Sequence, residues 1–426
     1  MVQRSWFARD IFVGAPVYPL VGISSEVCLH DAESSMRPAA GITRKSILVF
    51  AAICGLTVAS TYYFQPLFPV VGKDLHQSAA TISWVSTVLQ LGYSLGLFLI
   101  VPLGDYFDRR KLVPGLMVVS ALGLVGIATS SSVIPLLIWC ALVGVTSVVA
   151  QIVVGLVATI AEPRQRGAAI GNVMTGLLLG ILLARTISGL VAQYLSWRFV
   201  FAGAALMVGL LAIGARRSIP AVERSYQGSY PALLRSLGAT FASEVVVRRA
   251  AIIGALNFAC FSIFWNTSSL HLSSHPFKLG SAAIGLFGLV GVAGALAARL
   301  AGRMADRGRQ WVTSVVMNFL IVLAYVALLI FPFNMVAIVV AVIVLDFGVQ
   351  GSHISNQATI FAIRPDARSR ITSIYMTSYF IGGALGSFLS TLAFRDGGYR
   401  LVAAAGVVLA LAATTFRLLT LRLPGA

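Results

Sequence analysis

Residues 345 to 357 read Leu-Asp-Phe-Gly-Val-Gln-Gly-Ser-His-Ile-Ser-Asn-Gln and lie late in an apolar stretch with no other charge. In an α-helix, residues spaced by 4, 7 and 11 positions share one face. Asp346, Gln350, His353 and Gln357 therefore form a polar stripe. Such a stripe is a functional-site hypothesis if the stretch spans a membrane.

The composition indicates a membrane protein. Of 426 residues, 58% are hydrophobic and 11% are charged, whereas a soluble chain averages about 25% charged residues. The formal net charge of +17 comes from basic residues in short loops between apolar runs, which favours membrane topology over nucleic-acid binding. The four cysteines show no CxxC spacing, so we expect no metal site, disulfide framework or cofactor.

Twelve apolar segments follow one another from Ser46, most with about the 20 residues that a helix needs to cross the hydrocarbon core of a bilayer. The sequence therefore predicts an all-α polytopic protein with twelve transmembrane helices. The predicted segments are 46–72, 80–103, 112–131, 133–160, 168–192, 198–216, 250–273, 279–301, 311–331, 333–361, 371–393 and 400–421.

The loops predict the orientation of these segments. Loops after even-numbered segments hold most of the Lys and Arg residues, as in Arg109, Arg110 and Lys111. The positive-inside rule then places both termini in the cytoplasm. We expect residues 1–45 to be a disordered cytoplasmic extension, and residues 217–249 to be a cytoplasmic linker with a short interfacial helix.

An internal repeat divides the chain. Asp105 and Asp306 each follow an even-numbered segment and precede an arginine cluster, and Met174 and Thr175 match Met376 and Thr377 at nearly the same offset. The sequence therefore predicts two pseudo-repeat six-helix bundles, 46–216 and 250–426, in the same membrane orientation.

Two loop motifs carry a family resemblance. Residues 101–111 read Val-Pro-Leu-Gly-Asp-Tyr-Phe-Asp-Arg-Arg-Lys, and residues 302–309 read Gly-Arg-Met-Ala-Asp-Arg-Gly-Arg. With twelve segments in two halves, the chain resembles the major facilitator superfamily, which carries G-x-x-x-D-R-x-G-R-R/K after its second helix and a degenerate copy after its eighth. The first copy departs from the pattern at Val101, Tyr106 and Asp108.

The resemblance implies a gating role for these loops, in which acids and arginines tie helix ends together in one conformation. An ion pair formed in a single state biases a two-state equilibrium. The alternative is that the charges only set topology. The implied gating residues are Asp105, Arg109, Arg110, Gly302, Asp306 and Arg307.

The fifth segment indicates which members of the family the chain resembles. Drug:proton antiporters of the family carry G-x-x-x-G-P-x-x-G-G there, and this chain keeps small residues at the glycine positions but has Arg185 in place of the proline. Small residues predict close helix packing. The chain looks most like sugar-efflux-like and drug-efflux-like bacterial members, whose signatures match residues 63–67, 90–93 and 184–189. This implies a monomer in the bacterial inner membrane.

Two charges lie deep in the predicted spans. A charged side chain near a helix centre costs about 2.5 to 3.5 kcal/mol on insertion scales, so Arg185 requires a partner, and both a substrate-binding and a structural role stay open. Asp346 is the predicted proton-coupling residue, with a structural hydrogen bond as the alternative. His353 titrates near neutrality and is either a proton relay or a core histidine.

A central cavity of a carrier mixes apolar walls with few polar groups. The polar or aromatic candidates for contact with a substrate, besides Arg185, are Gln65, Gln151, Asn257, Trp265 and Gln350.

These observations predict a secondary active transporter that works by alternating access. The predicted activity is proton-coupled export, by antiport, of a small organic molecule such as a drug-like compound or a sugar. The alternatives are a symporter or facilitator for uptake, and a non-transporting membrane receptor. An intramembrane enzyme is disfavoured because the spans contain no HExxH, G-x-S-x-G or paired-carboxylate motif. The expected partners are the lipid bilayer, protons and the substrate.

Overall fold

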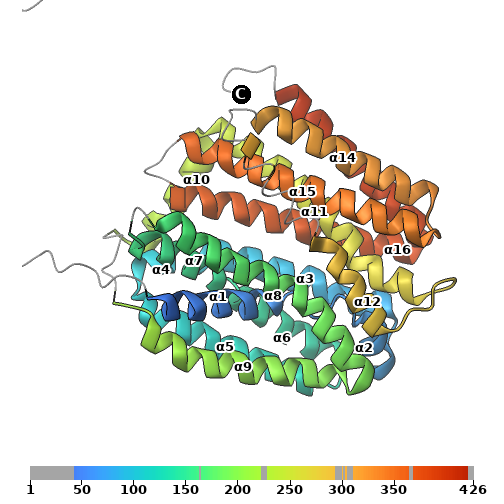
Figure 1. The fold of residues 1–426 in the computed structure, drawn as a ribbon, viewed down its shortest axis with the longest axis horizontal. Helices are drawn as coiled ribbons and strands as arrows, with labels where there is room; N and C mark the ends of the chain where they lie inside the picture. The colour runs from blue at the N-terminus through green and yellow to red at the C-terminus, as the bar shows by residue number, and fades with distance from the viewer. Residues whose placement is uncertain are drawn as a thin grey trace, which may run out of the picture. The chain divides into compact units, whose positions relative to one another are not determined.

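A computed structural model describes residues 43–162, 165–221, 228–292, 300, 303–304, 310–363 and 368–420. The described chain is built from helices (Figure 1). The helices before the linker are α1 (Arg44–Ala59), α2 (Phe68–Asp74), α3 (Ala79–Leu99), α4 (Leu103–Tyr106), α5 (Arg109–Thr129), α6 (Val133–Thr146), α7 (Val149–Ile160), α8 (Arg166–Tyr194) and α9 (Trp197–Ser218). The later helices are α10 (Tyr230–Ser243), α11 (Val245–Ser273), α12 (Ser281–Phe287), the 3₁₀-helix η1 (Gly288–Val292), α14 (Gln310–Ile330), α15 (Met335–Ile363) and α16 (Arg368–Thr420).

The helices follow the predicted apolar segments in order. Within the described ranges, nine helical stretches are long and apolar enough to cross a membrane. One of them, α16, is bent at Gly397 and Gly398 and covers two predicted segments, while the first segment is divided between α1 and α2. The prediction of an all-α polytopic membrane protein is confirmed, and twelve spans are consistent with this arrangement.

Local sequence signals account for several helix ends. Asp108 caps α5, because its side chain accepts a hydrogen bond from the backbone N–H of Arg110 at 2.9 Å. Residues 230–243 of the predicted linker form α10, which has Pro231 in its first turn, the position where proline is tolerated. Its interfacial placement stays a prediction, and most of the predicted extension 1–45 lies outside the described residues.

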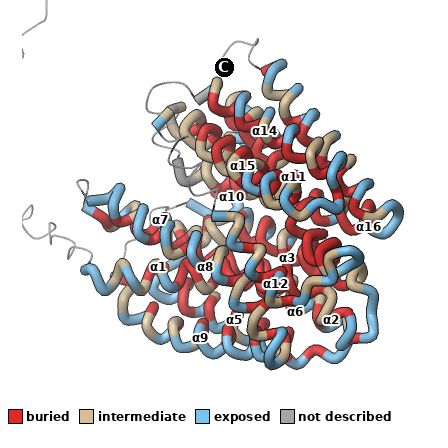
Figure 2. The backbone as a smooth tube through the Cα atoms, turned by 45° about the vertical axis from the view of Figure 1, so that its right-hand side comes forward, coloured by how far each residue is buried: buried red, intermediate tan, exposed pale blue. Residues whose placement is uncertain are grey.

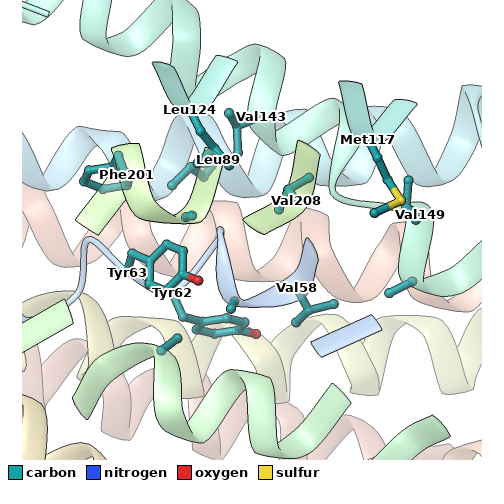
Figure 3. Packing of buried hydrophobic residues seen from close by; sticks show 14 of the residues in the cluster. Val58, Tyr62, Tyr63, Leu89, Met117, Leu124, Val143, Val149, Phe201 and Val208 are labelled. Carbon is teal, nitrogen blue, oxygen red and sulfur yellow. The ribbon is translucent and has the colours of Figure 1, made fainter. Parts of the chain in front are cut away.

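Buried hydrophobic residues form three clusters. One contains residues of α1 to α9, including Tyr63 and Phe201, whose rings meet edge to face at 6.1 Å (Figure 3). A second contains residues of α11, α14, α15 and α16, such as Tyr325. The third joins both sets of helices, with Tyr93 of α3 stacked on Phe380 of α16 at 4.1 Å.

Large apolar side chains also face outward. Leu122 on α5 and Leu206 on α9 are 60% and 64% exposed, and exposed residues follow the outer sides of the helices (Figure 2). An apolar exterior of this extent marks a surface that contacts lipid.

Glycines allow close approach at two places along α8. A Cβ at Gly180 would lie 2.5 Å from the Cα of Gly55 on α1, and a Cβ at Gly189 would lie 2.9 Å from the Cα of Gly285 on α12. The predicted close packing of the fifth segment is confirmed, and it fixes α8 between an early and a late helix.

Candidate functional site

A break in the first predicted span supplies part of the site. The regular helix α1 ends at Ala59 and α2 begins at Phe68, with Pro66 between them. Proline lacks a backbone N–H and disfavours helical geometry in the residue before it. The side chain of Gln65, in this break, is buried and accepts a hydrogen bond from Nε of Arg185 at 2.5 Å.

Arg185 lies on α8 and is 3% exposed. Its guanidinium carbon lies 3.8 Å from the ring centre of Trp265 and 5.3 Å from that of Tyr62. A desolvated cation over an aromatic face is stabilised by about 2 kcal/mol or more. Its Nη2 is buried without a hydrogen-bond partner among the described residues, so one donor remains for a further acceptor.

Asp346 lies on α15 and is 5% exposed. Its Oδ1 accepts a hydrogen bond from the indole Nε1–H of Trp265 at 3.1 Å. In the described part of the chain, no ion pair within 4 Å joins Asp346 to Arg185. The two buried charges therefore share one tryptophan, which binds the cation with its face and the carboxylate with its edge.

Gly291 of η1 borders both charges. A Cβ built on it would lie 3.0 Å from Oδ2 of Asp346 and 3.5 Å from Nη1 of Arg185. The absence of a side chain there lets the backbone of η1 approach both groups closely. We call the set Gln65, Arg185, Trp265, Gly291 and Asp346 the central cluster.

The central cluster unites residues that are far apart in sequence. Four of them, Gln65, Arg185, Trp265 and Asp346, were candidates from sequence, and the structure brings them together. Sequence reasoning missed Gly291, although glycines recur at every third position in 285–291, which is a pattern of a close helix contact.

Other predicted substrate contacts lie elsewhere. The amide nitrogen of Asn257 donates to the Ser352 hydroxyl at 2.8 Å, and that of Asn318 donates to the same hydroxyl at 3.2 Å, so Ser352 joins α11, α14 and α15. Gln151 on α7 is half-buried. Gln350 is half-buried one turn beyond Asp346 on α15.

His353 lies two turns from Asp346 on the same helix, about 10 Å away at 1.5 Å per residue. Its Nδ1 is 3.0 Å from the Tyr375 hydroxyl, and its ring centre is 4.6 Å from that of Tyr379. The imidazole therefore has a polar partner and aromatic neighbours from α16.

The first loop motif forms an ordered contact. Arg109 Nη2 lies 2.7 Å from Asp105 Oδ1, and Arg109 Nε donates to the Gly104 carbonyl at 2.6 Å. Arg110 Nε donates to the Arg216 carbonyl at 3.3 Å, at the end of α9. The second-copy residues Gly302, Asp306 and Arg307 lie outside the described residues.

Polar contacts also join early helices to late ones. The hydroxyls of Ser83 on α3 and Thr391 on α16 are 2.8 Å apart, and the Gln90 amide donates to Ser387 at 3.0 Å. Thr186 on α8 donates to the Gly285 carbonyl at 3.2 Å.

No group of three or more His, Cys, Asp or Glu side chains able to hold a metal ion occurs among the described residues.

The sequence is similar to those of proteins named as transporters. The sequence profile of the Major Facilitator Superfamily matches residues 48–387. Over 365 residues the chain is 42% identical to the putative uncharacterized transporter YgaY of Escherichia coli, covering 86% of this chain and 93% of that protein. Over 393 residues it is 31% identical to the probable transporter SCO4007 of Streptomyces coelicolor, covering 90% of each.

Solved structures share the fold. A bacterial homologue of the human lysosomal transporter Spinster, in an inward-facing and unoccupied conformation, superposes with a TM-score of 0.70 at 15% identity, covering 91% of this chain and 98% of that one. A mutant of the nucleoside transporter NupG gives a TM-score of 0.69 at 13% identity, covering 88% of this chain and 99% of that one. At these identities the likeness shows the fold alone.

Proposed function

The chain belongs to the Major Facilitator Superfamily and is a multi-pass membrane transporter rather than an enzyme, and from this premise we propose that it exports a small organic molecule in exchange for protons. The proposed location is the bacterial inner membrane, with both termini in the cytoplasm and a monomer as the working unit. The proposed moving parts are two six-helix bundles, 46–216 and 250–426, which rock about the central cluster.

One observation carries this proposal: Arg185 and Asp346 are both buried and share Trp265 without a direct ion pair. Arg185 and Gln65 belong to the first proposed bundle, whereas Trp265 and Asp346 belong to the second. A change in the charge of Arg185 or Asp346 therefore changes the strength of the contact between the two bundles. A two-state equilibrium shifts only if a ligand interacts differently with the two states, and this cluster provides such a difference.

The chemistry of the cluster favours competition between substrate and proton. Ionised Asp346 accepts a hydrogen bond or attracts a cation, and Arg185 Nη2 donates to an acceptor on the same molecule. Protonation of Asp346 removes the negative charge and converts one of its acceptor oxygens into an O–H donor. A neutral polyhydroxylated molecule or an amine that binds the ionised form is then released, which is the requirement for antiport.

Two further roles complete the proposal. His353, hydrogen-bonded to Tyr375, passes protons between Asp346 and the predicted cytoplasmic end of α15. The Asp105–Arg109 pair and the hydrogen bond from Arg110 on α5 to the Arg216 carbonyl at the end of α9 stabilise one conformation of the first bundle. These contacts therefore act as a gate. Gln350 contributes to the substrate path, one turn from Asp346.

The test uses the full-length protein in proteoliposomes on a solid-supported membrane. A panel of neutral sugars, amine-bearing drugs and organic anions is applied with and without a pH gradient. We expect a sugar or amine to move against the proton flux. Asp346→Asn removes the proton-driven transport, whereas Asp396→Asn, which neutralises an exposed carboxylate paired with Arg395, leaves it intact.

Three outcomes contradict the proposal. Proton-driven transport at the wild-type rate by Asp346→Asn would remove Asp346 from the mechanism. Movement of substrate in the same direction as protons would identify a symporter. Saturable binding without flux, under every gradient, would identify a receptor.

A further inference from the structure

A groove lies between α5 and α9, away from the central cluster. It has a volume of about 750 Å³ and is formed where the first turns of α5 meet the last turns of α9. The two helices run side by side along the lower edge of Figure 1. Its lining includes four cations, namely Arg110, Lys111, Arg216 and Arg217, and no acidic side chain among the described residues.

The cations of the groove are arranged around its mouth. Arg110 is fixed by its hydrogen bond to the Arg216 carbonyl. Lys111, Arg216 and Arg217 are exposed, and within the described ranges none of them is ion-paired. Cations at the C-terminus of α9 are favoured by the helix dipole, and among the residues that the structure describes the lining of the groove supplies no carboxylate to compensate their charge.

The remainder of the groove is apolar and open. A Cβ at Gly115 on α5 or at Gly209 on α9 would have no other atom within 4 Å. Val118 and Ile213, which also line the groove, are 49% and 56% exposed. The groove therefore continues from a cationic mouth into an apolar channel between two helices.

The position of the groove matches a bilayer boundary. Both helices are long and apolar enough to span a membrane, and the groove lies at the helix ends that the loop charges predict to be cytoplasmic. Basic pockets between transmembrane helices at that level bind anionic lipid headgroups. A soluble anion matches the mouth but leaves the apolar channel unfilled.

We propose that this groove binds one anionic phospholipid of the cytoplasmic leaflet. Its phosphate lies against Lys111, Arg216 and Arg217, and one acyl chain lies along Gly115 and Gly209 between α5 and α9. The ligand combines a negative headgroup with an apolar chain, as the groove combines a cationic mouth with an apolar channel. The site does not depend on the transported substrate or on proton coupling.

The test titrates the purified full-length protein with phosphatidylglycerol, or with phosphatidylcholine of identical acyl chains. Native mass spectrometry measures the bound lipid. We expect one phosphatidylglycerol to bind at least tenfold more tightly than phosphatidylcholine. Replacing Lys111, Arg216 and Arg217 together by Gln weakens phosphatidylglycerol binding about 100-fold, since each cation near an anionic lipid contributes about a factor of five. The control variant replaces Lys278, Arg395 and Arg400 by Gln. It removes the same number of positive charges, but from exposed residues outside the groove.

A second pair of variants tests the apolar channel with all charges retained. Gly209→Leu fills the groove and weakens phosphatidylglycerol binding at least tenfold. Gly203→Leu, on the same helix and with equally open surroundings, leaves binding unchanged. Because both leucines are added where space exists, loss of folding is not expected, and circular dichroism verifies the helix content.

Specific results overturn the proposal. Equal affinity for the two lipids, or unchanged binding in either groove variant, contradicts an anionic lipid site. Competition by glycerol phosphate at the concentration at which phosphatidylglycerol binds would identify a free-phosphate site instead.

Discussion

At the scale of single residues, Trp265 determines how two buried charges coexist. Its ring face lies against Arg185 and its N–H donates to Asp346. Both charges are almost completely buried, since they are at most 5% exposed. A buried charge without compensating contacts is strongly unfavourable, so the indole, with Gln65, is a main reason that both charges are tolerated.

Replacement of Trp265 by Phe separates these two contacts. Phe retains a ring for Arg185 but removes the donor to Asp346, and a hydrogen bond to a charged group contributes roughly 1.5 to 3 kcal/mol. We expect Trp265→Phe to lower the free energy of unfolding by that amount, measured by denaturant unfolding in detergent. The control is Trp84→Phe, whose ring meets Phe388 edge to face at 5.4 Å. Equal losses in both variants would show that the indole donor has no special role.

The sequence predicted most of this site at the level of residue type. Arg185 and Asp346 are conspicuous because charges are costly in apolar spans, and Gln65 and Trp265 were among a few polar candidates. The sequence did not show that Asn257 faces Ser352, because helix rotation depends on which side chains meet across helices. Gly291 was missed for the same reason, since its contribution is a close backbone approach to two residues distant in sequence.

At the scale of helices, the irregular segments position the site. The predicted first span is interrupted between α1 and α2, which places Gln65 opposite Arg185. The predicted eighth span begins as α12 and continues as η1, which places Gly291 beside Asp346. Apolar length predicts where a chain crosses the membrane but carries little information about where its helix breaks, so these features were not foreseen.

Close packing of α8 against α12 provides a second prediction. A Cβ at Gly189 would lie 2.3 Å from the Ser281 carbonyl oxygen, and overpacking typically costs 1 to 3 kcal/mol. We expect Gly189→Ala to lower thermal stability and to reduce transport several-fold, because it disfavours the conformation in which α8 and α12 touch. Gly171→Ala on the same helix has open space and is the control. If the two variants behave alike, the α8–α12 contact does not limit transport.

At the scale of the whole molecule, side-chain hydrogen bonds join early helices to late ones. Ser83 and Thr391 meet near the α2 end of α3, and Gln90 meets Ser387 two turns further along. If the proposed bundles rock, such contacts must separate in each cycle. The repeat in the sequence predicted two similar halves. At the offset that relates Met174 to Met376, positions 83 and 391 correspond to 285 and 189, which approach each other between α12 and α8.

A cysteine pair at positions 83 and 391 tests this movement. The two hydroxyl oxygens are 2.8 Å apart, so Ser83→Cys with Thr391→Cys should place both sulfurs within reach of a disulfide. We expect oxidation to block transport, and reduction to restore it, in liposome flux assays. Each single cysteine variant should transport normally under oxidant. Transport that persists after complete cross-linking would show that this interface does not open.

The indole of Trp265 has a practical consequence. A tryptophan in simultaneous contact with the guanidinium of Arg185 and the carboxylate of Asp346 is an intrinsic fluorophore whose local electric field changes when either group gains a ligand or a proton. The emission of the unlabelled protein thus contains an optical signal from the centre of the molecule.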